Sequence, residues 1–288
     1  MIFSKNIKSL IKRNKFFNSY HAKKMSLTSK RLDICSAQFA HCFNLSNKKS
    51  ISGKTCLEIG GGWLLTHALV LHLLGAKRII TTDVFPLANP KYLYNALHSS
   101  VTSIIRDVLS PFEDHEKIRS RLDNLLSLPE FDFNILEELG IHYSAPIDLS
   151  KNKLNESVDF VYSNSVLEHV PLDDINNLVK NLSLSLKKNG FMLHCIHLED
   201  HKSSSKPFDF LSINSKSFDS INQTRRGNRL RCSNWIDIFS KIDETNSELI
   251  YKWIRKDKLL PKFIDNSIQF IDEEDLRVSH IGILTNKI

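Results

Sequence analysis

The chain has 288 residues with a formal net charge of +7, and 41% of its residues are hydrophobic while 25% are charged. This composition is typical of a globular protein, and it excludes a disordered chain, a collagen-like chain and a disulfide-stabilised miniprotein. The length predicts one enlarged domain, or one domain that carries a small addition.

Positive charge is concentrated near the N-terminus, where residues 1–31 contain Lys and Arg but no acidic residue. Such a segment is attracted to an anionic partner such as a phosphate, a nucleic acid or a membrane surface. It is also what a solvated basic helix looks like. The sequence leaves both interpretations open.

No targeting or membrane-spanning segment is expected. The longest apolar stretch, Leu64–Leu74, is much shorter than the roughly 20 residues of a spanning helix, and residues 1–24 lack the apolar core of a signal peptide. The five cysteines form no CxxC pair, so we expect reduced thiols, a cytoplasmic location and no metal ion. No zinc finger and no basic strand interleaved with aromatic residues is present, so no nucleic-acid partner is expected.

Residues 1–50 are polar with loosely helical apolar spacing, and we expect a helical N-terminal cover there. Residues 54–84 predict a β-α-β unit. A strand over 54–59 leads into Gly60-Gly61-Gly62, a buried helix over 64–74 follows, and a second strand covers 78–82. A unit of this kind implies a parallel sheet with a right-handed crossover.

The remaining elements continue the alternation after a long interruption. Residues 85–145 show no strand signal and predict a helical insertion. Beyond it we expect a strand over 157–163, a helix over 172–186 that stops at Lys187–Gly190, a strand over 191–197, a helix around 235–242, and strands near 249–254 and 278–285. The last two fit an antiparallel hairpin at the sheet edge. The main domain is therefore expected over 51–288, with 201–248 as an acceptor-side segment and 249–288 as the hairpin.

The glycine turn carries the first chemical signal. Gly60, Gly61 and Gly62 follow a strand, so a ligand can approach the backbone closely and meet the start of the next helix. Asp83 ends the next strand, where a carboxylate can accept hydrogen bonds from both ribose hydroxyls of an adenosine. Together the two features indicate a nucleoside-containing cofactor.

Two details disfavour NAD. The third glycine of a GxGxxG pattern would stand at Leu65, and Glu58 places an acid just before the turn. An acid is unfavourable beside a pyrophosphate, whereas it suits a ligand with a cationic amino group. S-adenosylmethionine is such a ligand, with a ribose, an ammonium and a sulfonium but no phosphate.

At these residues the sequence resembles the class I S-adenosylmethionine-dependent methyltransferases. The matching stretches are Leu57–Gly62, Thr82–Val84, Val158–Val170 and the turn before Phe191–His197, and the resemblance covers about residues 50–200. The ending Leu167-Glu168-His169-Val170 looks like the fourth-strand motif of members that act on small molecules. The family's third turn glycine is absent at Leu64.

The resemblance implies a doubly wound α/β fold with a mostly parallel seven-stranded sheet, the Rossmann-like methyltransferase fold. It also implies roles for single residues. Glu58 and the Gly60–Gly62 backbone would hold the methionine part of the cofactor. Asp83 would bind the ribose and Val84 would lie beside the adenine. Asp148 is a candidate for the adenine edge, with a turn-forming role as the alternative, and Asn164 would lie near the methyl group.

Methyl transfer to oxygen requires alignment, exclusion of water and removal of a proton by a group that titrates near neutrality. His169 follows the expected strand over 157–163, His197 ends the strand over 191–197 and His201 follows that strand, at the edge where ligands bind in this fold. We predict that at least one of them contacts the acceptor. The spacing of His197, Asp200 and His201 is not a recognised metal-ligand pattern.

The run Arg225–Arg231 is the densest basic stretch, and Asn228, Arg229 and Arg231 are its candidate contacts to an anionic or hydroxyl-rich acceptor. A solvated loop is the alternative. Phe208–Arg231 also looks similar to uncharacterised methyltransferases associated with bacterial surface-polysaccharide synthesis.

The sequence thus predicts methyl transfer to an oxygen of a small molecule or of a surface-glycan precursor. Two alternatives stay open. One is a quinone-like or lipid acceptor, with the basic N-terminus docked on a membrane surface. The other is a binding module that keeps the fold without catalysis.

Overall fold

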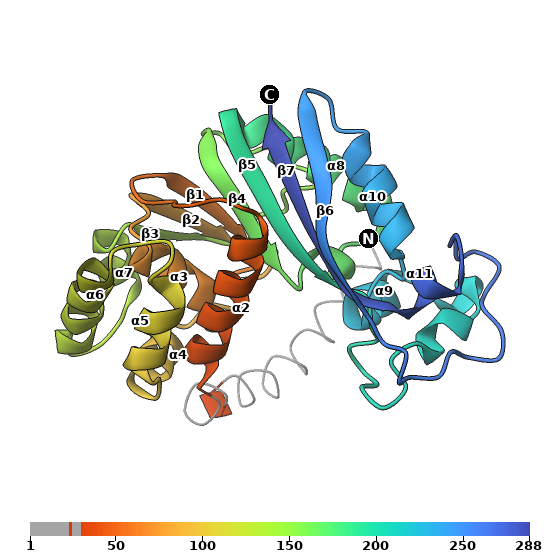
Figure 1. The fold of residues 1–288 in the computed structure, drawn as a ribbon, viewed down its shortest axis with the longest axis horizontal. Coiled ribbons are helices and arrows are strands. Elements are labelled where there is room, and N and C mark those ends of the chain that lie inside the picture. The colour runs from red at the N-terminus through yellow and green to blue at the C-terminus, as the bar shows by residue number, and fades with distance from the viewer. Residues whose placement is uncertain (1–22, 25–29) are drawn as a thin grey trace, which may run out of the picture. The chain divides into compact units, whose positions relative to one another are not determined.

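The computed structural model describes residues 23–24 and 30–288, so most of the basic N-terminal segment lies outside the described residues (Figure 1). The chain divides into two compact units. The first contains residues 49–54 and 61–146 together with the described residues before residue 42. The second contains 42–48, 55–60 and 147–288.

Seven strands form one sheet in the order β3-β2-β1-β4-β5-β7-β6. The strands are β1 Thr55–Ile59, β2 Arg78–Thr82, β3 Ile141–Ser144, β4 Val158–Asn164, β5 Leu186–His197, β6 Thr245–Ile254 and β7 Val278–Lys287. The pairs β2–β3, β1–β4 and β4–β5 are parallel, whereas β7 runs antiparallel to both β5 and β6. The predicted mostly parallel, seven-stranded α/β fold is confirmed, as is the antiparallel C-terminal pair.

The first unit holds β2, β3 and most of the helices before residue 146. These helices are α3 Thr66–Leu73, α4 Pro90–His98, α5 Thr102–Leu109, α6 His115–Ser127 and α7 Phe133–Glu138, and α2 Arg31–Leu45 begins in this unit. Helix α3 is buried nearly all round, as its apolar sequence predicts. The expectation that residues 85–145 contain no strand is wrong, because β3 lies there and pairs Ile141 with Ile79 of β2. Of its four residues only Ile141 is buried, so the strand has little hydrophobic pattern to reveal it.

The second unit holds the remaining strands with α8 Leu172–Ser185, α9 Ser220–Arg226, α10 Cys232–Ser240 and α11 Glu273–Arg277. In Figure 1 helix α10 lies beside β6, and α8 is seen partly behind the strands. Helix α8 ends where the sequence predicts, but β5 begins directly after it at Leu186, so Lys187–Gly190 belongs to the strand. Phe43, Phe160 and Phe191 pack together in the core of this unit, with the last two ring centroids 4.6 Å apart.

His194 is a titratable group inside this core. Its Nδ1 lies 2.8 Å from the hydroxyl of Ser163, and complete burial lowers its pKa from 6.5 to about 3. Between these two pH values the unfolded chain binds one more proton than the folded chain does. Above pH 6.5, His194 therefore causes no loss in the free energy of unfolding. Below pH 6.5 its protonation in the unfolded chain lowers the free energy of unfolding by up to about 1.4 kcal/mol for each pH unit.

The variant His194→Asn should show a weaker loss of stability on acidification than the wild-type protein. Asn keeps an oxygen acceptor near the position of Nδ1 for Ser163 but cannot be protonated in this range. Its smaller volume should lower stability at pH 7 as well. Urea unfolding at pH 7, 6 and 5 measures both effects, and equal pH slopes for the two proteins would contradict this assignment.

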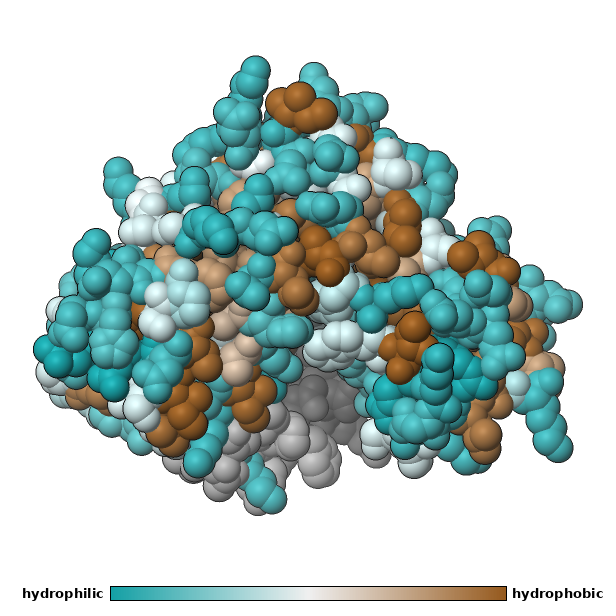
Figure 2. Space-filling view, viewed as in Figure 1, coloured by the Kyte–Doolittle hydropathy of each residue, from teal (hydrophilic) through white to brown (hydrophobic). Residues whose placement is uncertain are grey.

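None of the described helices is long and apolar enough to cross a membrane. The region around α11 nevertheless places hydrophobic side chains on the surface among hydrophilic ones, as Figure 2 shows in brown and teal. Leu259, Phe263 and Ile271 are its most exposed large apolar residues, at 86%, 67% and 78% exposure.

Candidate functional site

In the first unit, the glycine turn is connected to the end of β2 by main-chain and side-chain hydrogen bonds. The Gly61 N–H donates to the carbonyl of Thr82 over 3.1 Å. The Gly62 N–H donates to Oδ2 of Asp83 over 3.1 Å, and the Phe85 N–H donates to Oδ1 over 3.0 Å. The two features that the sequence analysis combined, the glycine turn and Asp83, are therefore in direct contact.

The carboxylate of Asp83 is held in place by backbone hydrogen bonds and can still accept further hydrogen bonds. Burial raises the pKa of its carboxyl, while the hydrogen bonds from Phe85, Gly62 and Val84 act in the opposite direction. An ionised carboxylate has about four lone-pair sites, so it can accept further hydrogen bonds from a ligand. Val84 and Phe85 follow it as exposed apolar side chains, at 50% and 37% exposure. These are the features that a ribose and its attached base would need on this side of the turn.

In the second unit, β1 delivers Glu58 and Gly60 to the start of the turn. Glu58 is 2% exposed and pairs with Tyr162 of β4 in the sheet register. Gly60 has a positive φ of +73°, and a Cβ there would lie 2.5 Å from Cγ2 of Val166. Glycine is therefore required at this position both by the backbone conformation and by the packing.

Asn164 and Asp148 also lie in the second unit. Asn164 is half-buried at the end of β4, next to Cys195 of β5 in the register. Asp148 accepts hydrogen bonds from the backbone and hydroxyl of Ser150 and from Lys151. Burial raises the pKa of Asp148, but these contacts outweigh it and lower the pKa. They are the contacts of a turn-forming Asp, and the contact with the adenine edge stays a prediction.

The three predicted histidines lie together at the carboxyl ends of β4 and β5. The ring centroids of His169 and His201 are 4.3 Å apart, and those of His197 and His201 are 4.5 Å apart. His169 directs Nδ1 at the carbonyl of Thr224 over 2.8 Å. Burial lowers the pKa of His169, and the nearby His201 and His197 act in the same direction.

Three more residues belong to this cluster although the sequence analysis did not select them. Glu168 is 1% exposed and has its Oε1 3.4 Å from Nε2 of His201. Glu199 receives Nε2 of His197 at 3.1 Å, and His280 stacks on His197 with centroids 4.2 Å apart. Glu168 precedes His169, and Glu199 lies between His197 and His201, so their closeness to predicted histidines in the sequence could have identified them. His280 is found only through the antiparallel register of β5 and β7, which pairs it with His197.

The predicted acceptor contacts of the basic run, Asn228, Arg229 and Arg231, differ in burial and in their hydrogen-bond partners. Arg231 is completely buried and donates to the carbonyls of Leu198 and Val278, so it holds the chain rather than facing a ligand. Asn228 is 3% exposed and donates to the carbonyls of Leu167 and Val170, which fixes the turn that carries Glu168 and His169.

Arg229 is more accessible than Asn228 and Arg231. It is half-buried, bonds the carbonyl of Ile213 and lies over the ring of Phe218 at 3.9 Å. A small hollow adjoins the cluster, with Glu168, His197, Glu199, Phe210 and residues 227–230 in its walls. The structure thus brings the basic run and the histidines to one place within the second unit.

No family model matches the chain, and no curated protein matches it either. Among solved structures it is similar to the N-methyltransferase NodS from Bradyrhizobium japonicum WM9, with 11% identity over 87% of this chain and 94% of that chain and a TM-score of 0.40. It is also similar to an S-adenosylmethionine-dependent methyltransferase from Mesorhizobium loti, with 14% identity over 87% of this chain and 98% of that chain and a TM-score of 0.48. Likenesses at this level show the fold and do not assign an activity.

Proposed function

We propose that this protein is an S-adenosylmethionine-dependent methyltransferase that acts on an oxygen of a small molecule or of a surface-glycan precursor. The observation that carries the proposal is the contact of the Gly61-Gly62 turn with Asp83 at the end of β2. The sequence around this contact, with Glu58 before the turn, favours a cationic cofactor without phosphate.

The residues present fit such a cofactor. Asp83 retains acceptor capacity for ribose hydroxyls, and Val84 offers an apolar surface for the base. Glu58 provides a negative charge for the ammonium group, and Gly60 allows the turn to adopt its positive φ against Val166. Bound S-adenosylmethionine supplies an electrophilic methyl group on a sulfonium.

The acceptor side is assigned to the second unit. His169, His197 and His201 converge where β4 and β5 end, and Asn164 ends β4. Imidazoles at this place orient a hydroxyl and promote loss of its proton, which is the step that methyl transfer to oxygen needs from a protein. Arg229 lies in the wall of the neighbouring hollow and offers a cation to an anionic or hydroxyl-rich acceptor.

The expected activity is transfer of label from methyl-labelled S-adenosylmethionine to a compound in host small-molecule or glycan fractions. The purified protein is incubated with each fraction, and products are separated by chromatography and analysed by mass spectrometry. Label in the small-molecule or glycan fraction supports the proposal. Label in the lipid fraction would instead identify a quinone-like or lipid acceptor, and cofactor binding without transfer to any fraction would favour a binding module.

A further inference from the structure

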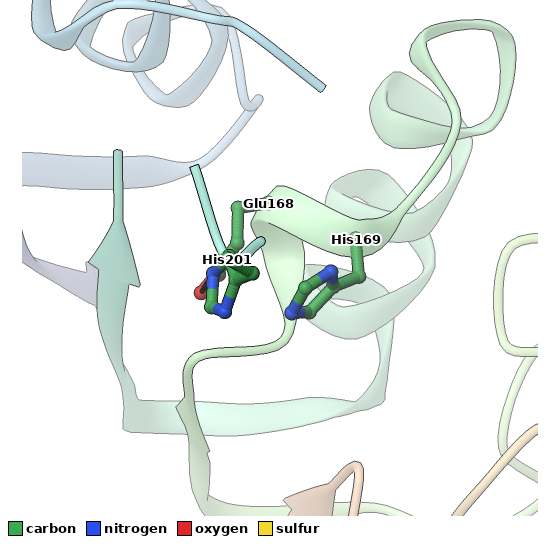
Figure 3. Close-up of side chains that lie close together, drawn as sticks. All are labelled: Glu168, His169 and His201. Atoms are coloured by element: carbon green, nitrogen blue, oxygen red, sulfur yellow. Dashed lines mark ion pairs between the residues drawn. The ribbon is translucent and has the colours of Figure 1, made fainter. Parts of the chain in front are cut away.

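We propose that Glu168, His169 and His201 form a binding site for a divalent first-row transition-metal ion, which nothing in the sequence spacing assigns. One ligand atom from each residue lies within 4.8 Å of the others. Figure 3 shows how the three side chains converge, with Glu168 and His169 from the turn after β4 and His201 from the segment after β5. All three belong to the second unit.

The buried carboxyl group of Glu168 is the first observation that indicates a bound cation. The residue is 1% exposed, yet neither Oε1 nor Oε2 has a hydrogen-bond partner among the described residues. A buried carboxylate without hydrogen bonds is costly unless a cation compensates it. The side chain that the structure places beside it is His201, whose Nε2 lies 3.4 Å from Oε1, beyond the usual length of a charge-assisted hydrogen bond.

The distance between Oε1 of Glu168 and Nε2 of His201 is the separation expected for two atoms that bind the same ion. Bonds of about 2.0–2.1 Å in a tetrahedral zinc site place neighbouring ligand atoms about 3.3–3.4 Å apart. Oε1 of Glu168 and Nε2 of His201 already have this separation. The remaining ligand atom needs only a small movement to close the site, since all three lie within 4.8 Å.

His169 is prepared as the third ligand by its own hydrogen bond. Its Nδ1 lies 2.8 Å from the carbonyl oxygen of Thr224, and because a carbonyl only accepts, Nδ1 carries the proton. Nε2 then has its lone pair free. Histidines that bind metal ions usually donate their second ring N–H to a carbonyl or carboxylate in this way.

A second triad nearby has comparable spacing and consists of His197, Glu199 and His280. It is a weaker candidate for an ion site than the Glu168 triad. Its carboxylate is already satisfied, because Glu199 binds both His197 and the guanidinium of Arg255. These contacts lower the pKa of Glu199 although burial opposes them. We therefore place the ion at the Glu168 triad.

The donor set defines the class of ion. Two imidazole nitrogens and one carboxylate suit Zn²⁺, Fe²⁺, Mn²⁺ or Co²⁺ and leave coordination positions open. His201 retains 23% exposure, so the open side is accessible. If the proposed function is correct, an acceptor hydroxyl takes an open position, and the ion lowers its pKa so that its proton passes to water. This last role rests on the proposed function, whereas the ion site does not.

The test is a titration of the full-length, chelator-treated protein with Co²⁺, followed by visible absorption, and with Zn²⁺, followed by calorimetry. We expect one ion per chain. Glu168→Gln keeps the shape of the side chain, and His201→Ala removes a partly exposed ligand. Each should weaken binding at least about 10–100-fold, because loss of an outer partner of a ligand alone has an effect of this size. His115→Gln, an exposed histidine on α6, is the matched control and should bind as the wild-type protein does.

Titration of the same variants with S-adenosylmethionine shows whether they remain folded and keeps the two proposals separate. Loss of the ion with normal cofactor binding supports the site. If the wild-type protein binds no ion, or if Glu168→Gln and His201→Ala bind it with unchanged affinity, the site is refuted and Glu168 and His201 form an ordinary ion pair. Methyl transfer by metal-free protein would leave the proposed function intact while removing the ion's role in it.

Discussion

Replacing His201 by Gln should lower turnover by about 10²–10⁴-fold, which is the range for a positioned group that promotes proton transfer. His201 lies between His169 and His197 and close to Glu168. It is a candidate base in the metal-free protein and a candidate ligand when the ion is bound, and its loss lowers turnover in either case. The affinity for S-adenosylmethionine should change little, because the proposed contacts of His201 are to the acceptor. Single-turnover rates with labelled cofactor measure the loss once an acceptor fraction is known.

His115→Gln is the control for this variant, since it removes an exposed histidine on α6 of the first unit. It should retain wild-type turnover. The same measurement on His169→Gln and His197→Gln distinguishes the members of the cluster. If all three variants keep near-normal turnover, transfer requires no histidine, and an amine or carboxylate that needs only alignment becomes the better acceptor.

Replacing Asp83 by Ala should weaken binding of S-adenosylmethionine by about 100-fold or more. Hydrogen bonds to a charged group contribute about 1.5–3 kcal/mol each, and the proposed ribose contacts are two. The variant also loses the hydrogen bonds from Gly62 and Phe85 that fix the turn. Calorimetric titration gives the dissociation constants.

Asp83→Asn removes only part of both contributions. The amide has one oxygen, so it can accept from one of the two backbone N–H groups of Gly62 and Phe85, and it lacks the charge and one acceptor for the ribose. We expect intermediate affinity for Asp83→Asn and a thermal stability between those of the wild-type protein and Asp83→Ala. An unchanged dissociation constant for Asp83→Ala would remove Asp83 from the cofactor site.

The sequence predicts the β-α-β unit well because each of its elements has a strong local signal. The strand Arg78–Thr82 has the predicted bounds, and the Gly75 stop follows α3 closely. Short β3 escapes prediction because its position is set by pairing with β2, which is a tertiary contact. The early start of β5 escapes for a similar reason, since β4 provides a partner for Leu186.

In the candidate site, too, the sequence predicts what has a local signal and misses what depends on tertiary contacts. Gly62 and Asp83 were selected from their spacing, and the structure places them in contact. Glu168 was visible only as a neighbour of His169, because its burial and its lack of hydrogen bonds among the described residues are properties of the fold. Arg231 was selected for its charge, but the sequence does not reveal that the side chain is buried and donates to the carbonyls of Leu198 and Val278.

The central claim, that the turn after β1 serves S-adenosylmethionine, is tested most directly by calorimetric titration of the wild-type protein with S-adenosylmethionine and with NAD. Gly60→Val should bind the cofactor poorly, because Gly60 has φ +73° and its added side chain meets Val166. Gly53→Ala has a similar φ of +74° but open space around it, so it should bind normally. Saturable binding of one S-adenosylmethionine and none of NAD is the predicted result. Binding of NAD instead, or normal binding of S-adenosylmethionine by Gly60→Val, would contradict the account.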